Sequence, residues 1–231
     1  PLAGPAQCYA APLIGENAMP RLMRGEVSPL RGWVKAVEAL FPDRPWLAID
    51  QAWVLTLTGQ LDQVEPVLHQ AERCIPPDDT TGETRMMLGY IAAIRAYVAS
   101  QHGDARRTID LARQALGYLP ENEAAVRSVV TFTLGGACWL SGDVTEASRA
   151  FAEAGRVGKA AGNIHVAVPA ICSWAELLIA QGQLQNAAAA YRAALQLAIT
   201  AEGRPLPVAA RAHIGLSQPL YEWGGLDAAL H

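Results

Sequence analysis

Histidine, cysteine and carboxylate side chains are the groups best able to carry out acid–base, nucleophilic or metal chemistry, and their spacing in this chain favours none of these. The five histidines form no His-Glu-x-x-His pattern, and the near pair of His69 and Glu72 is predicted to lie on a solvated helix face. No C-x-x-C pair, G-x-S-x-G elbow or phosphate-binding G-x-x-x-x-G-K-[ST] loop is present. The sequence therefore predicts no catalytic residue, no metal ligand and no enzyme.

Binding chemistry is better supported, because aromatic side chains recur at helical spacing together with a few polar groups. The residues that we predict to contact a ligand are Trp53, Tyr90, Tyr97, Phe132, Trp139, Glu176, Arg211, Gln218, Tyr221 and Arg95. Aromatic rings give a large contact area at low entropic cost, and the polar groups could orient a ligand. A small organic molecule, a sugar or an apolar peptide would suit such a surface. The alternative is that the rings only pack on one another as core.

The elements that position these residues are easiest to read between Ser128 and Ala154. Small residues at Gly135 and Ala147 would let two helices approach closely, and Gly142 would turn the chain between them. Phe151 would fill the space beneath the next hairpin. This spacing is that of the tetratricopeptide (TPR) repeat, and a single such hairpin cannot bury its apolar face without neighbours.

The same pattern recurs along the chain when each copy is aligned on its turn glycine. The six turn glycines are Gly25, Gly59, Gly103, Gly142, Gly182 and Gly224. Their intervals are 34, 44, 39, 40 and 42 residues, so most repeats exceed the usual TPR length of about 34 residues. We predict an all-α, TPR-like α-α superhelix of about six helical hairpins with long repeats, forming one domain over residues 1–231. An alanine-rich bundle that matches the pattern by chance is the alternative.

Proline and glycine positions set the predicted helix boundaries. Helices are expected near 14–24, 29–41, 45–58, 60–74, 83–101, 104–118, 122–141, 143–161, 164–181, 183–201, 207–223 and from 225 onward. Ser28, Asn163 and either Asp79 or Thr80 are expected N-caps. Pro169 falls inside its helix, which predicts a kink or a later helix start. Strand signals are absent.

Composition excludes several classes of partner. The net charge is −4 and no run of Lys or Arg is longer than Arg106-Arg107, so no DNA contact is expected. With 51% hydrophobic and 17% charged residues the chain is typical of a folded, soluble protein. The longest apolar stretch, residues 164–180, is short and carries polar groups, which indicates a buried helix and no membrane span. Scattered cysteines and the absence of a signal peptide predict a cytoplasmic location.

Two arginines lie where the repeat pattern favours apolar side chains. Arg95 takes a position that usually holds leucine, and Arg127 directly precedes the central hairpin. A half-buried arginine needs a partner. Structural pairing with Asp104, Asp110 or Glu123 is favoured over binding of an anionic effector.

Three longer runs resemble one family more closely than a generic TPR array. They are GENAMPRLMRGEVSPLRGWVKAVEALFPDRPWLAIDQAWVLTLTGQLDQVEPVLHQAE, GYIAAIRAYVA with its following Gly-Asp turn, and AHIGLSQPLYEWGGLDAAL, whose YEW-x-x-LDAA ending is the most specific part. They resemble the central superhelical domain of the large ATP-dependent LuxR-type transcriptional regulators, the MalT-like family. The resemblance covers nearly the whole chain.

The resemblance implies a sensor module. In that family an N-terminal NTPase, a helical-repeat sensor and a C-terminal helix-turn-helix share one chain, and the sensor receives an inducer, a sugar in the best-known member. It implies that this segment relays inducer binding to ATP-driven self-association, and that ATP binds to the NTPase module, with no cofactor in this segment. The alternative is a TPR-like scaffold that binds a protein or peptide without a small-molecule ligand.

Overall fold

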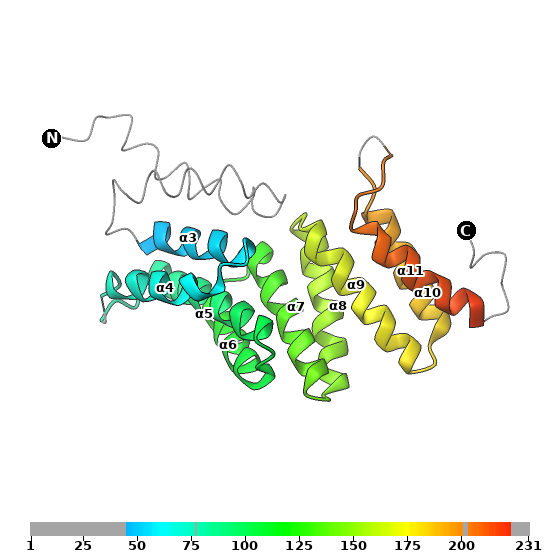
Figure 1. Cartoon of the computed structure of the whole chain (residues 1–231), viewed down its shortest axis with the longest axis horizontal. Coiled ribbons are helices and arrows are strands. Elements are labelled where there is room, and N and C mark those ends of the chain that lie inside the picture. Colours follow the sequence, from blue (N-terminus) through cyan, green and yellow to red (C-terminus); the bar gives the residue numbers. More distant parts are fainter. Residues whose placement is uncertain (1–44, 77, 201–202, 223–231) are drawn as a thin grey trace. The chain divides into compact units, whose positions relative to one another are not determined.

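The computed structural model describes residues 45–76, 78–200 and 203–222, and over this part of the chain the regular structure is helical (Figure 1). The elements are α3 (Pro45–Leu57), η1 (Leu61–Gln63), α4 (Val64–Arg73), α5 (Gly82–Gln101), α6 (Ala105–Tyr118), α7 (Ala124–Leu140), α8 (Val144–Ala160), α9 (Ile164–Ala180), α10 (Leu184–Leu197) and α11 (Ala209–Glu222). The helices predicted within this part are confirmed, although residues 60–74 divide into a short 3₁₀ turn and α4. The helices predicted before residue 45 and after residue 224, with Gly25, Ser28 and Gly224, lie outside the described residues.

The turn glycines predicted within the described part are confirmed by their backbone angles. Gly59, Gly103, Gly142 and Gly182 have φ values of 74°, 74°, 85° and 74°, in the left-handed region that favours glycine. After α7, the Asp143 amide donates to the Cys138 carbonyl at 2.9 Å and the Gly142 amide donates to the Trp139 carbonyl at 3.0 Å. This is the Schellman arrangement, which satisfies carbonyls at the end of a helix.

Residue contacts divide the chain into two compact units. The first unit contains α3, η1, α4, α5 and residues 110–118 of α6, and the second contains residues 105–109 of α6 and all of α7 to α11. In the first unit, the largest fully buried side chains come from α3, α4 and α5; they are Ile49, Trp53, Leu68, Ile91 and Ile94. Each helical hairpin in this unit buries its apolar side against a neighbouring helix, as the repeat pattern predicts.

The second unit is packed closely because small residues lie where helices meet. A Cβ atom built on Gly135 of α7 would lie 2.7 Å from Cδ1 of Phe151 in α8, so only glycine fits under that ring. Phe151 also packs at a tilt on Phe132, with ring centroids 5.7 Å apart. Phe151 therefore packs within its own hairpin, and its predicted role beneath the next hairpin stays a prediction. A further core cluster joins α9, α10 and α11 and includes Cys172 and Tyr191.

Long helices account for much of the extra repeat length. Helices α7, α8 and α9 have 17 residues each, and α5 has 20. Helix α9 begins at Ile164 and contains Pro169, so the alternative of a later start is wrong, whereas the kink stays a prediction. The connection between α10 and α11 carries an isolated β-bridge between Ile199 and Pro205, which the sequence did not indicate.

The N-cap of α5 differs from the predicted residues. The cap is Thr81, whose hydroxyl accepts a hydrogen bond from the Thr84 amide at 3.3 Å. Asp79 lies further back, where its carboxylate accepts from the Thr81 amide at 2.9 Å and the Thr84 hydroxyl at 2.8 Å. Thr81 and Asp79 both accept hydrogen bonds from polar groups at the start of α5. The Asp79 carboxylate therefore supports the N-cap, although the N-cap residue itself is Thr81.

Candidate functional site

The predicted ligand-contacting residues fall in both units and are described within each. The first unit holds Trp53, Tyr90, Tyr97 and Arg95, and the second holds Phe132, Trp139, Glu176, Arg211, Gln218 and Tyr221.

The rings of the first unit are largely buried. Trp53 is 2% exposed, and within the described part of the chain its indole N–H has no hydrogen-bond partner. Tyr90 is also buried and meets Trp46 edge to face, with ring centroids 5.3 Å apart and an interplanar angle of 85°. Tyr97 is half-buried. Trp53 and Tyr90 therefore belong to the core of this unit. The edge-to-face contact of Tyr90 with Trp46 stabilises that core further.

Arg95 is paired, as predicted, but with different partners. Its Nε and Nη2 atoms donate to Glu65 Oε1 at 3.0 and 2.6 Å, and Nη2 also donates to Glu72 Oε2 at 2.9 Å. Both glutamates belong to α4, so for Arg95 the predicted partners Asp104, Asp110 and Glu123 are wrong. The pairing predicted for Arg127 stays a prediction. Hydrogen bonds from Arg95 hold the pKa of Glu72 below its ordinary value. The guanidinium thus joins two helices, and a ligand role for Arg95 stays a prediction.

In the second unit, one side of α7 forms an apolar stripe that is not fully buried. The stripe consists of Ala125, Val129, Phe132, Gly136 and Trp139, which follow one another at helical spacing. Trp139 is 41% exposed, and a Cβ atom built on Gly136 would meet nothing within 4 Å. The Gly136 backbone therefore has free space beside it. Phe132 precedes it and Trp139 follows it on the same side of the helix.

Polar groups from α9 and α11 form a separate cluster in the same unit. Arg211 Nη2 donates to Ser173 Oγ at 2.9 Å and to the two Glu176 oxygens at 3.0 and 3.1 Å. Glu176 and Arg211 were predicted to share a site, and the structure brings them together. Helix α9 contacts both α7 and α11. We call the α7 stripe together with Ser173, Glu176 and Arg211 the second-unit face.

The groups beneath the polar part of this face are not reactive. Burial raises the pKa of the Cys172 thiol to about 11 and the pKa of the Tyr191 hydroxyl to about 12. Both groups are therefore neutral near pH 7, and Cys172 lacks the thiolate that a nucleophile needs. Near pH 7 these two residues therefore contribute neutral groups to this part of the unit.

Gln218 and Tyr221 continue along α11 from Arg211. Gln218 Nε2 donates to Glu222 Oε1 at 3.3 Å, and Tyr221 is 65% exposed. With Ile214 they form an exposed side of the helix. These two predicted residues are thus accessible, but the structure shows no contact between them and Glu176.

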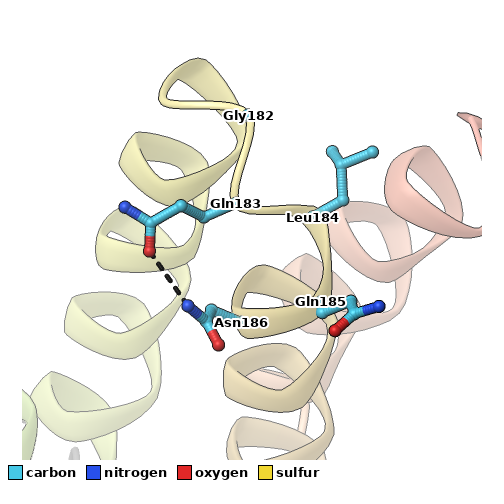
Figure 2. A pocket seen from close by; sticks show the side chains of 5 residues that line it. All are labelled: Gly182, Gln183, Leu184, Gln185 and Asn186. Atoms are coloured by element: carbon cyan, nitrogen blue, oxygen red, sulfur yellow. Dashed lines mark hydrogen bonds between the residues drawn. The ribbon is translucent and has the colours of Figure 1, made fainter.

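A pocket of about 340 Å³ lies at the turn between α9 and α10, away from the predicted residues. Its lining residues are Gly182, Gln183, Leu184, Gln185 and Asn186 (Figure 2). The Asn186 amide donates to the Gln183 side-chain oxygen at 2.9 Å. The pocket is open to solvent and is lined by uncharged side chains, so it supplies neither charge nor enclosure for tight binding.

Metal binding and membrane spanning can be tested over the described part of the chain. Within residues 45–76, 78–200 and 203–222, no group of three or more His, Cys, Asp or Glu side chains could hold a metal ion. None of the helices that the structure describes has the length and apolar character needed to cross a bilayer.

The sequence did not single out two polar residues that the structure makes prominent. Ser173 binds Arg211 across a gap of 38 residues, which no local pattern indicates. Asp50 is a buried acid in α3, where burial raises the pKa of its carboxyl to about 8. Its position inside the apolar run Leu47 to Leu57 could have drawn attention to it.

Comparison with solved structures shows the fold. TM-scores are 0.64 with BtubC (BKLC) from P. vanneervenii and 0.62 with PilW, described as a widely conserved type IV pilus biogenesis factor. The identities are 14% and 15%, and the matches cover 96% and 99% of this chain and 85% and 90% of the two structures. The TPR-like helical repeat predicted from the sequence is confirmed.

Comparison with curated proteins shows the family. The HTH-type transcriptional regulator MalT of Yersinia pestis (strain Pestoides F) is 30% identical over 195 residues, which are 82% of this chain and 21% of that protein. The MalT of Serratia proteamaculans (strain 568) is 29% identical over 185 residues, 80% of this chain and 20% of that protein. This chain thus spans about a fifth of these relatives. The family described as the MalT-like TPR region matches residues 89–231, more than half of the chain. The chain therefore belongs to the MalT-like TPR family.

Proposed function

We propose that this chain is the effector-sensing, signal-relaying helical-repeat module of a bacterial transcriptional activator. The observation that carries the proposal is the family match over residues 89–231, together with relatives that are HTH-type transcriptional regulators. The module binds a small-molecule inducer and controls ATP-dependent self-association of the activator. It carries out no reaction itself.

The second-unit face is the proposed inducer site. Its apolar part offers Phe132 and Trp139 with the open backbone of Gly136 between them, which suits a flat or apolar ring. Its polar part offers the paired charges of Glu176 and Arg211, which can exchange hydrogen bonds with hydroxyl or amide groups. Because these charges neutralise each other, an uncharged polar inducer fits better than an anion.

The proposed setting follows from the relatives and the composition. ATP is bound by another part of the activator, and DNA contact is also made elsewhere, since this chain has a net charge of −4. The partners of this module are the inducer and other copies of the activator. The proposed location is the cytoplasm, where DNA and inducer meet.

A thermal-shift screen of the 231-residue chain tests the proposal. Sugars, amino acids, aromatic acids and short peptides are compared, because a ligand that binds only the native state stabilises it by ~2.7 kcal/mol at a hundredfold excess over Kd. One chemical class is expected to raise the melting temperature, and Trp139→Ala is expected to remove the shift. A shift that persists unchanged in Trp139→Ala would move the site away from the second-unit face.

A second candidate is a TPR-like scaffold that binds a protein or peptide and no small molecule. Exposed apolar side chains around the Gly142 turn favour it, since Leu140 is 69% exposed and Val144 is also exposed. A screen without any small-molecule shift, together with binding of a partner that Leu140→Ala weakens, would favour this function over the first.

A further inference from the structure

Two junctions between successive hairpins are built in different ways. Where α8 meets α9, the connection spans only residues 161–163, and the helices lie against each other through glycine. A Cβ atom built on Gly155 would lie 2.8 Å from Ile171 Cγ1, and one built on Gly158 would lie 3.2 Å from Ala167 Cβ. Surfaces packed this closely do not deform continuously, so this junction is rigid.

Where α4 meets α5, the connection is longer and a cluster of charged side chains crosses the junction. The connection runs from residue 74 to residue 81 and includes Pro76, and the backbones of α4 and α5 come close at few positions. The Arg95 side chain, which is 18% exposed, spans the junction and binds both Glu65 and Glu72. We call these three residues the Arg95 clasp.

His69 extends the clasp on the α4 side. Its Nε2 atom lies 3.2 Å from Glu65 Oε1 and its Nδ1 atom lies 3.2 Å from Glu72 Oε2. The imidazole thus bridges the same two carboxylates that Arg95 binds from α5. All four side chains are polar, so α4 is held to α5 here by charge and hydrogen bonds, which salt weakens.

The contact between α3 and α5 includes an aromatic pair, in contrast to the charged clasp between α4 and α5. Trp46 meets Tyr90 edge to face, and its indole N–H donates to Glu83 Oε1 at 3.1 Å. The buried side chains Trp53 and Ile94 add apolar area in the same unit. Aromatic and apolar contacts are not screened by salt, so they persist when the clasp weakens.

We propose that the α4–α5 junction is a salt-sensitive joint, latched by the Arg95 clasp, at which the α3–α4 hairpin swings about the Trp46–Tyr90 contact when the clasp opens. The joint gives the first unit one place where it bends, while the α8–α9 junction of the second unit stays rigid. The proposed joint does not depend on a ligand, so a screen that finds no inducer does not contradict it.

Hydrogen exchange of the 231-residue chain at low and high salt tests the joint. The Debye length falls from about 30 Å at about 0.01 M to about 3 Å at about 1 M salt. This change screens the partly exposed carboxylates of Glu65 and Glu72, although less than it screens a fully exposed pair. Backbone amides of α4 are expected to exchange severalfold faster at high salt, because the charge-assisted pairs of Arg95 are weakened. Amides of α9 are expected to change little.

Substitutions separate the clasp from a general salt effect. Arg95→Leu places an uncharged side chain at the junction, so the salt dependence of α4 exchange is expected to disappear. Arg156→Leu is the matched control, because Arg156 pairs with Glu153 within α8 and joins no two hairpins. It is expected to leave the salt dependence of α4 unchanged.

The joint would be disproved by α4 exchange that is equal at both salt concentrations. Loss of the salt dependence in Arg156→Leu, or its persistence in Arg95→Leu, would also overturn it. If Arg95→Leu does not fold, Glu72→Gln is tested in its place. Glu72→Gln removes one of the two carboxylates that Arg95 binds and keeps the size of the side chain. That variant is expected to reduce the salt effect severalfold, and an unchanged effect would contradict the proposal.

Discussion

The ring of Tyr191 in α10 lies directly against the backbone of Gly215 in α11. A Cβ atom on Gly215 would be 2.6 Å from the Tyr191 hydroxyl oxygen and closer still to the ring, and Tyr191 is 1% exposed and cannot move aside. Gly215→Ala is therefore expected to lower the free energy of unfolding by ~1–3 kcal/mol through overpacking. Urea denaturation followed by circular dichroism measures the change.

Gly136→Ala is the matched control for this substitution. Gly136 is also helical, but a Cβ atom there would meet nothing within 4 Å. Alanine is favoured over glycine in a helix by up to ~1 kcal/mol, so this variant is expected to be more stable than the parent. Equal stability of the two variants would show that Tyr191 does not constrain position 215.

Asp50→Asn is expected to stabilise the chain, and more strongly at pH 8 than at pH 5. Burial raises the folded-state pKa of Asp50 from 3.8 to about 8, so the folded state keeps a proton that the unfolded state loses. The stability that the wild-type protein has with Asp50 protonated is fully present below the pKa of Asp50 in the unfolded chain. It is lost as the pH rises from that value toward the pKa of Asp50 in the folded chain. Asparagine carries no proton to lose, which removes this cost.

The measurement is the melting temperature of both proteins at the two pH values. Asp62→Asn serves as the charge-matched control, because Asp62 is exposed in η1 of the same unit. A gain from Asp50→Asn that does not depend on pH would mean that the Asp50 carboxyl is ionised in the folded chain.

The two tryptophans predicted to bind a ligand are expected to respond differently to truncation. Trp53→Ala removes a fully buried ring and should cost ~3–5 kcal/mol of unfolding free energy. Trp139→Ala removes a ring that is 41% exposed and should cost less, ~1 kcal/mol, so it remains folded for binding experiments. Equal losses in chemical denaturation would refute this distinction between core and surface.

Asn163→Asp tests a buried hydrogen bond between a turn and a helix. Asn163 precedes α9 and is 1% exposed, and its amide donates to the Ser128 hydroxyl of α7 at 3.1 Å. Aspartate has the same size but brings a carboxylate in place of the donor, so a loss of ~2–3 kcal/mol is expected near pH 7. Thermal melting that is unchanged from pH 5 to pH 8 in this variant would argue against burial of the group.

The repeat architecture could be predicted from sequence because its signals are local. The turn at Gly142 requires a left-handed backbone, and the close approach at Gly135 requires the absence of a side chain, so both glycines mark the hairpin directly. The partners of Arg95 could not be found in this way. Glu65 and Glu72 lie 30 and 23 residues away, and only the packing of α4 against α5 brings them near.

The candidate site was predictable in part for the same reason. Glu176 and Arg211 occupy equivalent faces of the first helices in successive hairpins, so the repeat register places them together. Burial was harder to predict. Trp53 lies six residues before the turn glycine Gly59 and Trp139 lies three residues before Gly142. The repeat pattern placed both rings on the same wall, yet the first is enclosed and the second is exposed.

The most direct test of the central proposal is calorimetric titration of the ligand class found in the screen into three variants and the parent chain. Trp139→Ala and Arg211→Leu each remove one part of the second-unit face, and both are expected to weaken binding at least tenfold, ~1.4 kcal/mol. Leu140→Ala, which truncates a more exposed neighbour outside the stripe, is expected to leave Kd unchanged. Unchanged affinity in Trp139→Ala and Arg211→Leu, or no binding of any ligand class to the folded chain, would contradict the assignment of this face as the inducer site.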